Sequence, residues 1–317
     1  MTEAARSRTI WCLMDGRHGH QNQVLGLADQ LSARVDAHVC CIDLSSTTGR
    51  LGTLYRSCRQ LSGYADSPDL LIGAGHRTHL PLVVLRHRFA AQSVVLMKPS
   101  MPFHWFDYCL VPGVHELENP PDNVLQTKGV LNRVQPRPNA QRMGGLMLIG
   151  GPSAHYRWSD QQICQQIQSV VEGSEQMWTI ATSRRTPPSF LRALGDCDSD
   201  IQIVPPEDTD PEWLPSQLSQ AQTAWVTEDS VSMMYEALTS GARVGVLELE
   251  RHRDNRVTEC TDLLVRDGDV LRWSAWTASR HLPEPTGCIW EAERCSRELL
   301  ARLNWIPPVP EIRPEAA

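Results

Sequence analysis

The feature that most constrains this chain is a repeated order of segments: a short apolar run, a loop rich in Gly, Ser or Asp, and a stretch with helical period. This order recurs along both halves of the 317 residues. Strands that alternate with helices pair in parallel, because each helix carries the chain back to the start of the next strand. The sequence therefore predicts an α/β protein with a parallel sheet in each half.

The predicted elements form two groups on either side of a polar segment. In the first half we expect strands at 9–14, 37–43, 69–73, 93–98 and 108–111, and helices at 21–32, 51–61 and 78–89. In the second half we expect strands at 146–150, 177–181, 201–204, 224–227 and 244–247, and helices at 160–171, 188–194, 213–220, 231–239 and 255–267. Residues 131–142 are polar, contain two prolines and show no period, which predicts a linker.

The length of the chain exceeds what one hydrophobic core usually organises, which favours two domains with a cleft between them. We assign residues 1–135 and 143–287 to two Rossmann-like domains. Residues 288–317 are expected to hold a C-terminal helix at 290–303 and a tail that is extended or frayed from Pro307 onward.

Charge and composition narrow the classes of partner. The formal net charge is −7, so a general basic field for binding nucleic acid is absent. The ten cysteines contain no C-x-x-C pair and are expected to be reduced core residues. No apolar run approaches the roughly 20 residues that cross a bilayer, and no signal-peptide region follows Met1. We therefore expect a cytoplasmic protein that touches a membrane only from outside.

Two loops of the first half carry residues suited to chemistry. The first runs from Asp15 to Gln23, where the glycines let backbone N–H groups approach an oxyanion, and where Asp15 and His20 are candidates for proton transfer. The second, Gly73-Ala74-Gly75-His76-Arg77-Thr78, repeats this pattern of small and basic residues. The alternative for the first loop is an ordinary turn between strand and helix with exposed histidines.

Two loops of the second half suit a diphosphate. The segment from Gly150 to Trp158 combines glycines with Ser153, and Arg184 and Arg185 follow a neighbouring strand, with one of the pair expected to face solvent. In the segment from Glu228 to Leu238, Ser230 and Ser232 can cap a helix, and Glu236 can accept hydrogen bonds from a diol such as a ribose. The alternative is an ordinary N-cap with a glutamate on the helix surface.

These loops, in this order, resemble the mitochondrial-fission "elongated mitochondria" proteins of plants and their bacterial relatives. The matching segments are Asp15-Gly16-Arg17-His18-Gly19-His20-Gln21-Asn22-Gln23, Lys98-Pro99-Ser100, Thr127-Lys128-Gly129-Val130-Leu131-Asn132, Gly150-Gly151-Pro152-Ser153-Ala154-His155-Tyr156, Ser183-Arg184-Arg185-Thr186-Pro187 and Glu228-Asp229-Ser230-Val231-Ser232-Met233. The stretch after Asp107 departs from the family's pattern of a proline followed shortly by histidine-aspartate.

More distantly, the two halves resemble a GT-B glycosyltransferase, in which two Rossmann-like domains face each other across a cleft and the second holds the nucleotide sugar. By that likeness Glu236 would bind the ribose, Arg184 would meet the charge of the diphosphate, and His20 or Asp15 would be the catalytic base. The nucleotide-sugar contacts that the resemblance implies are Gly151, Pro152, Ser153, Arg184, Glu228, Ser230, Ser232 and Glu236. The acceptor side would comprise Gly16, Gly19, Gln23, His76 and Lys98. The C-terminal helix would cross back to the first domain.

These observations lead to one main hypothesis about function and two alternatives. The main hypothesis is a nucleotide-sugar-dependent glycosyltransferase, inverting and without a metal ion or cofactor, that acts on a cell-envelope glycolipid, an oligosaccharide or a lipopolysaccharide precursor at the inner face of the cytoplasmic membrane. The first alternative is a sugar-nucleotide epimerase or hydrolase, which needs the same donor site without an acceptor. The second is a non-catalytic adaptor at a membrane, as the plant family name implies.

Overall fold

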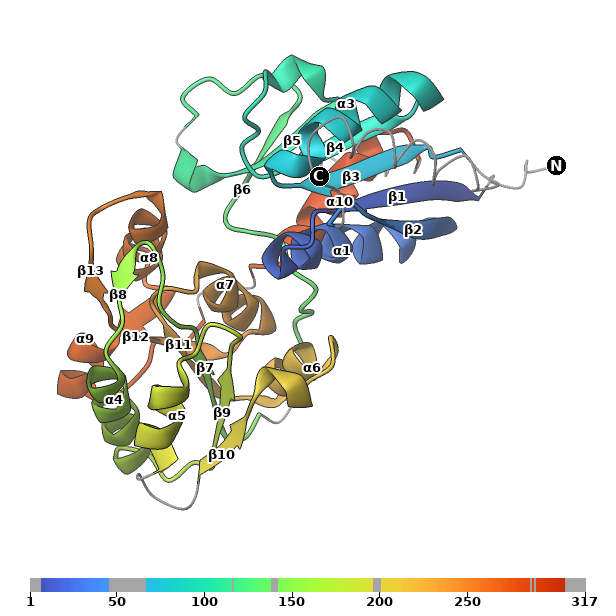
Figure 1. The fold of residues 1–317 in the computed structure, drawn as a ribbon. Helices are drawn as coiled ribbons and strands as arrows, with labels where there is room; N and C mark the ends of the chain where they lie inside the picture. Colours follow the sequence, from blue (N-terminus) through green and yellow to red (C-terminus); the bar gives the residue numbers. More distant parts are fainter. Residues whose placement is uncertain are drawn as a thin grey trace, which may run out of the picture. The chain divides into compact units, whose positions relative to one another are not determined.

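The computed structural model describes residues 7–45, 67–115, 117–137, 142–195, 201–285, 287 and 289–305 of the chain. The chain divides into two compact units (Figure 1): Met1–Arg133 with Glu291–Ala317, and Val134–Trp290. The first boundary lies inside the polar segment 131–142 that the sequence analysis names as a linker. The helix expected at 51–61 and the tail from Pro307 lie outside the described residues.

The first unit is built on a six-stranded sheet in which all strands run parallel. Their spatial order is β2-β1-β3-β4-β5-β6. The strands are β1 (Arg8–Met14), β2 (Ala37–Asp43), β3 (Leu70–Ala74), β4 (Gln92–Leu96), β5 (Tyr108–Pro112) and β6 (Val124–Thr127). The central strand β3 is buried along its whole length, because helices cover both faces of a parallel sheet.

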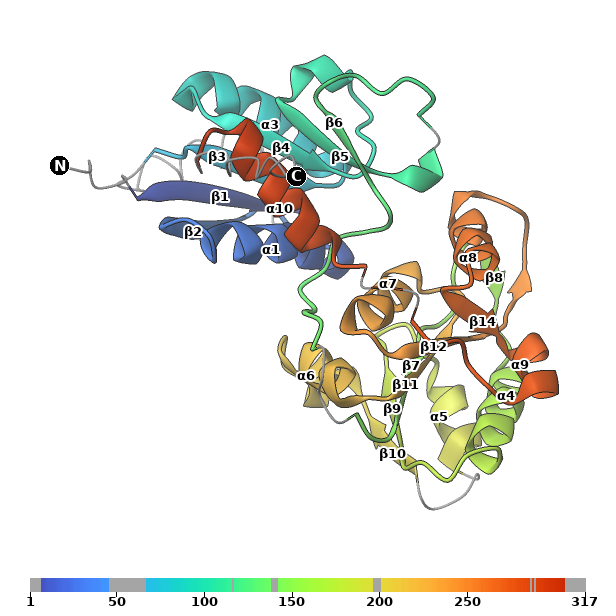
Figure 2. The ribbon, with the colours of Figure 1, turned by 180° about the vertical axis from the view of Figure 1, so that it is seen from behind.

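Three α-helices of the first unit fall within the described residues: α1 (His18–Ser32), α3 (His76–Phe89) and α10 (Glu291–Arg302), with short 3-10 turns at Phe103–Trp105 and Gly113–His115. The C-terminal helix α10 returns to this unit and packs beside α1 (Figure 2). An ion pair of 2.8 Å joins Arg34 to Glu293, and the Lys128 backbone N–H donates to Glu291.

The second unit contains another parallel six-stranded sheet, with the order β10-β9-β7-β11-β12-β14. The strands are β7 (Gly145–Ile149), β9 (Trp178–Thr182), β10 (Ile201–Val204), β11 (Thr223–Thr227), β12 (Arg243–Leu247) and β14 (Val270–Arg272). A small antiparallel pair joins β8 (Tyr156–Arg157) to β13 (Glu250–Arg251).

The helices of the second unit are α4 (Asp160–Glu172), α5 (Pro188–Gly195), α6 (Trp213–Gln220), α7 (Val231–Ser240), α8 (Arg256–Arg266) and α9 (Trp273–Ser279), with a 3-10 turn at Pro206–Asp208. Two of them begin with side-chain caps: Ser159 accepts from the Gln162 N–H, and Asn255 forms a capping box with Thr258. These caps satisfy amide groups that an uncapped helix leaves without partners.

The structure confirms the α/β class and the parallel sheet in each half. It adds strands β6 and β14 and helix α9, which the sequence analysis does not anticipate because each is short and lacks a clear period. The cysteines within the described residues are free; most are buried, but Cys41 is exposed.

Candidate functional site

Each sheet has one point at which the strand order reverses, and the loops that follow the strands there are where open α/β sheets bind ligands. In the first sheet the reversal lies between β1 and β3, because the chain places β2 on one side of β1 and then β3 on the other. In the second sheet it lies between β7 and β11. The four loops singled out in the sequence analysis follow these four strands.

Asp15 and His20 form the central pair of the first unit. The Asp15 carboxylate, which lies directly after β1, is 4% exposed, and its Oδ2 lies 2.8 Å from Nδ1 of His20 on α1. Its Oδ1 accepts the backbone N–H of Arg17 at 3.0 Å. A buried carboxylate bound to Nδ1 fixes the tautomer in which Nε2 carries the lone pair, so His20 is oriented to accept a proton at Nε2.

Gly75 makes this arrangement possible. Its φ is +85°, in the left-handed region that favours glycine, and it precedes the first residue of α3. A Cβ at this position would overlap Nδ1 of His20 and lie 2.8 Å from Oδ2 of Asp15. The loop after β3 therefore passes directly over the Asp15–His20 pair. The loops that follow β1 and β3 thus meet at the switch point, which is the place where the strand order reverses.

The structure spreads the residues expected on the acceptor side over this edge of the sheet. Gly16, with a φ of +84°, makes the turn after Asp15, and Lys98 is exposed after β4. Gly19 lies in the first turn of α1, and Gln23 is 5% exposed on the same helix. The fifth residue, His76, begins α3 and bonds to Ser100.

In the second unit, hydroxyl groups tie the loop after β7 to its neighbours. The backbone N–H of Gly150 donates to the Thr227 hydroxyl at the end of β11, at 2.8 Å. The hydroxyls of Ser183 and Thr186 donate to the Gly150 carbonyl at 2.8 and 2.6 Å. The ends of three neighbouring strands are thereby fixed together before any ligand binds.

Arg185 and Asp229 complete this framework: Arg185 is one of the two arginines expected near a diphosphate, and Asp229 has no role predicted from the sequence. The guanidinium group of Arg185 lies 2.7 Å from Oδ2 of Asp229, donates to the Ser230 hydroxyl at 3.0 Å and donates to the Gly151 carbonyl at 3.1 Å. The Asp229 side chain is fully buried, and it also accepts the Gly151 N–H. Arg185 thus joins the β7 loop to the start of α7.

Arg184 has the opposite environment. It is exposed, and within the described part of the chain it has no hydrogen-bond or ion-pair partner. Arg185 therefore makes structural contacts, whereas the guanidinium group of Arg184 is exposed and can bind an anion. The only signal in the sequence was the pair itself, because a loop has no period to show which side chain turns inward.

The other residues expected at the nucleotide sugar lie around the start of α7. Ser230 precedes the helix and is 7% exposed, Ser232 is half-buried in its first turn, and Glu236 is 6% exposed further along. In the loop after β7, Pro152 is exposed, and the Ser153 hydroxyl accepts the backbone N–H groups of residues 155 and 156. These contacts hold the loop in a tight turn.

Glu228 differs from the expectation that it contacts a nucleotide sugar. Its side chain is 3% exposed, and Oε1 lies 2.9 Å from Arg272 and 3.2 Å from Arg251. Oε2 accepts the Leu249 N–H. Asp262 binds the same two guanidinium groups at 2.8 and 2.6 Å, so Glu228 belongs to a four-residue ionic cluster that joins the loop after β11 to β13, α8 and β14.

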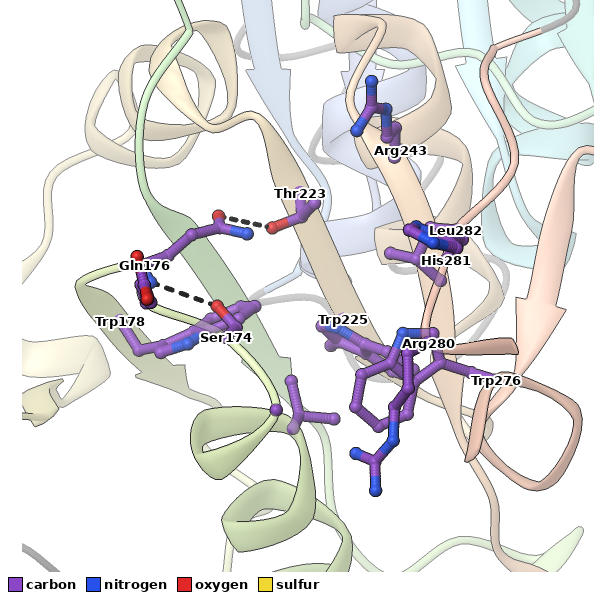
Figure 3. Close-up of a pocket in the computed structure, with 13 residues that line it drawn as sticks. Ser174, Gln176, Trp178, Thr223, Trp225, Arg243, Trp276, Arg280, His281 and Leu282 are labelled. Atoms are coloured by element: carbon purple, nitrogen blue, oxygen red, sulfur yellow. Dashed lines mark hydrogen bonds between the residues drawn. The ribbon is translucent and has the colours of Figure 1, made fainter. Parts of the chain in front are cut away.

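A separate cavity of about 370 Å³ lies at the opposite edge of the second sheet (Figure 3). Thr223 and Arg243, the first residues of β11 and β12, lie at its wall, whereas the loops described above follow the last residues of the strands. Its three indole rings, from Trp178, Trp225 and Trp276, are at most 5% exposed, so they offer no open surface on which a ring could stack. We therefore do not place the candidate site there.

Solved structures similar to this chain define the class of fold. A protein described as a UDP-N-acetylglucosamine 2-epimerase from Listeria monocytogenes matches with a TM-score of 0.63 and 12% identity, over 95% of this chain and 98% of that one. MurG from Acinetobacter baumannii matches with a TM-score of 0.54 and 12% identity, over 94% and 100% of the two chains. The UDP-GlcNAc 2-epimerase from Neisseria meningitidis, solved with UDP-GlcNAc, gives a TM-score of 0.57 at 11% identity, over 94% and 100%. The fold is GT-B.

The chain belongs to the mitochondrial fission ELM1 family, whose model matches residues 18–303. This confirms the resemblance drawn from the loop motifs. A search of curated protein sequences found no match.

Two further findings concern membranes and metals. None of the helices in the described segments is long and apolar enough to cross a bilayer. Across the same residues, no group of three or more His, Cys, Asp or Glu side chains is arranged to hold a metal ion.

Proposed function

We propose that this protein is a nucleotide-sugar-dependent glycosyltransferase that inverts the anomeric centre and acts on a cell-envelope glycolipid or lipopolysaccharide precursor. The observation that carries the proposal is the 2.8 Å contact between buried Asp15 and Nδ1 of His20. It gives the first unit an oriented base at a switch point of a GT-B fold, where an acceptor hydroxyl needs to lose its proton.

In the proposed reaction, Nε2 of His20 removes the proton from the acceptor hydroxyl. The oxygen attacks the anomeric carbon from the face opposite the nucleoside diphosphate, and the bond to the diphosphate breaks with inversion. Asp15 stabilises the imidazolium that forms on His20. The reaction class needs no metal when amide groups, a helix N-terminus and arginine neutralise the departing diphosphate.

The second unit has features that suit this donor. Arg184 is exposed without a partner among the described residues, and the Gly151–Ser153 turn lies beside the start of α7. The partial positive charge at a helix N-terminus favours a phosphate there. We propose that Arg184 and Ser232 contact the diphosphate and that Glu236 accepts hydrogen bonds from the ribose.

Peripheral contact with the inner face of the cytoplasmic membrane is part of the proposal. Residues 70–106 contain no Asp or Glu in a chain that carries 37 of them, yet they include Lys98 and three arginines. Arg86, His87 and Arg88 lie in the last turn of α3. Arg86 is paired with Asp107 at 2.6 Å and donates to the carbonyl of Trp105, whereas His87, Arg88 and the Trp105 indole are exposed. Basic residues beside an exposed indole suit an anionic lipid surface.

A thermal-shift panel of UDP, GDP, ADP, CMP and TDP with their sugars tests the donor site. A ligand at about 100 times its Kd adds roughly 2.7 kcal/mol of stability. We expect a response to one nucleoside diphosphate that Arg184→Ala weakens and that the matched control Arg192→Ala, an exposed arginine on α5, leaves unchanged. A cooperative melt with no response to any nucleotide would favour the non-catalytic adaptor instead.

A turnover assay with the nucleotide sugar found in this way tests the base. His20→Ala should lower the rate by about 10²- to 10⁴-fold, whereas His18→Ala, an exposed histidine two residues earlier in the chain, should keep it. Equal rates for both variants would mean that another residue is the base.

The similar epimerase structures support one alternative, a sugar-nucleotide epimerase or hydrolase. Conversion of the nucleotide sugar without any acceptor would favour this alternative.

A further inference from the structure

Ser100 and two histidines form a second cluster in the first unit, next to the Asp15–His20 pair but not part of it. The Ser100 hydroxyl lies 2.7 Å from Nδ1 of His76 and 3.1 Å from Nδ1 of His79. Ser100 itself is exposed, in the loop after β4. A reagent in solution can therefore reach an oxygen atom that two imidazole rings hold.

The two distances assign the protons of this cluster. A hydroxyl carries one proton, so it can donate to only one imidazole and must accept from the other. Bonds donated by O–H are typically 2.7–2.8 Å long, and those donated by N–H are 2.9–3.0 Å. Both contacts are satisfied when one imidazole accepts at Nδ1 and the other donates its Nδ1–H, and the shorter contact favours His76 as the acceptor. Burial lowers the pKa of His79 to about 4, with further lowering from His76 and His20, so this ring is neutral at pH 7.

We propose that Ser100 is a nucleophile that His76 activates, and that the first unit hydrolyses carboxylic esters that carry a negative charge. Ser100 is exposed, and its hydroxyl lies 2.7 Å from Nδ1 of His76. Two features favour an anion: exposed Lys98 is two residues earlier in the same loop, and His76 is the first residue of α3. The positive end of a helix of 14 residues suits the oxyanion that forms on the ester carbonyl.

In this reaction Oγ of Ser100 attacks the carbonyl carbon while its proton moves to Nδ1 of His76. The bond to the alcohol breaks, and the alcohol leaves with the proton from His76, which gives an acyl-serine. Water then attacks the acyl group, loses a proton to His76 and releases the carboxylic acid with Ser100 restored. This ester hydrolysis requires no nucleotide sugar, so its test is independent of the proposed glycosyl transfer.

The test is labelling of the full chain with a fluorophosphonate probe, with the modified residue identified by mass spectrometry. We expect modification of Ser100, and no modification of Ser189, which is exposed on α5 without an imidazole partner. His76→Gln should slow labelling by about 10²-fold or more, because it removes the general base. Labelling that is absent at Ser100, or equal at Ser100 and Ser189, would overturn the proposal.

Hydrolysis of two esters tests the substrate class. The wild type should cleave mono-4-nitrophenyl succinate, which is anionic, at least tenfold faster than neutral 4-nitrophenyl acetate, and Ser100→Ala should lose this activity. Ser100→Cys keeps the shape of the site and should move the acyl group to the new thiol, which separates lost chemistry from lost folding. Equal rates for the two esters would overturn the anionic substrate class, and unchanged hydrolysis by a folded Ser100→Ala variant would overturn the nucleophile.

Discussion

The buried imidazole of His79 should make the stability of the first unit depend on pH in a way that one substitution removes. His79 is 3% exposed on α3, its ring contacts Phe106, and its pKa is about 4 instead of the ordinary value near 6.5. The causes are burial first, and then the nearby His76 and His20. Between these two values the unfolded chain binds a proton at this position and the folded chain does not.

The sign and the size of the effect follow from this difference. The free energy of unfolding has its full value above about pH 6.5 and decreases as the pH falls toward 4. Below pH 4 His79 is protonated in both states and causes no further decrease. A shift of about 2.5 pKa units corresponds to about 3 kcal/mol at most, since each unit is worth 1.36 kcal/mol.

The measurement compares His79→Asn with the wild type. Asparagine places an amide nitrogen near the position of Nδ1, so it can still donate to Ser100, but it does not titrate in this range. Hydrogen exchange of peptides from α3 in increasing urea reports the free energy of unfolding of the unit that holds His79. The wild type should lose about 2.4 kcal/mol more than His79→Asn between pH 7 and 4.5.

The matched control is His87→Asn, an exposed histidine on the same helix, which should keep the dependence of the wild type. If the wild type and His79→Asn lost stability in parallel as the pH fell, His79 would titrate in the fold as it does in the unfolded chain. The argument from burial would then be refuted.

Three further predictions follow from single contacts. Gly75→Ala should lower the free energy of unfolding by about 1–3 kcal/mol and lower transferase turnover, because a residue with positive φ gains a Cβ that overlaps His20. The control Gly113→Ala, where a Cβ has space, should have the melting temperature of the wild type. Asp262→Asn should cost about 1 kcal/mol at pH 7, since its carboxylate is nearly half exposed and screened by solvent. Because two arginines lower the pKa of Asp262 to about 2, this difference from the wild type should vanish in urea unfolding as the pH falls from about 4 to 2. Arg185→Ala should speed hydrogen exchange in the loop after β7, because it removes the hydrogen bonds to Gly151 and Ser230. An unchanged exchange rate in this loop would contradict the conclusion that Arg185 joins the loop to the start of α7.

Much of the fold could be predicted from the sequence because it depends on local patterns. The apolar runs of β1, β3, β7 and β11 are continuous, as strands buried on both faces require. Loops with glycine follow β1, β3 and β7, and Glu228-Asp229-Ser230 follows β11. The loops that carry chemistry could be predicted for the same reason, since they lie where a strand ends and a helix begins. Short elements such as β14 and α9 escaped prediction because three to seven residues contain too little pattern.

The sequence by itself determined the class of fold, the family and the loops in which chemistry is expected, since these depend on the order of residues along the chain. Only the tertiary structure decided what individual side chains do. It showed that Glu228 is bound by Arg251 and Arg272, and that Arg185 makes structural contacts while its neighbour Arg184 is exposed. It also showed that Ser100 contacts two histidines of α3. The physical reason is that these contacts join residues 20 or more positions apart, and strand order, which the local pattern does not contain, determines which of them meet.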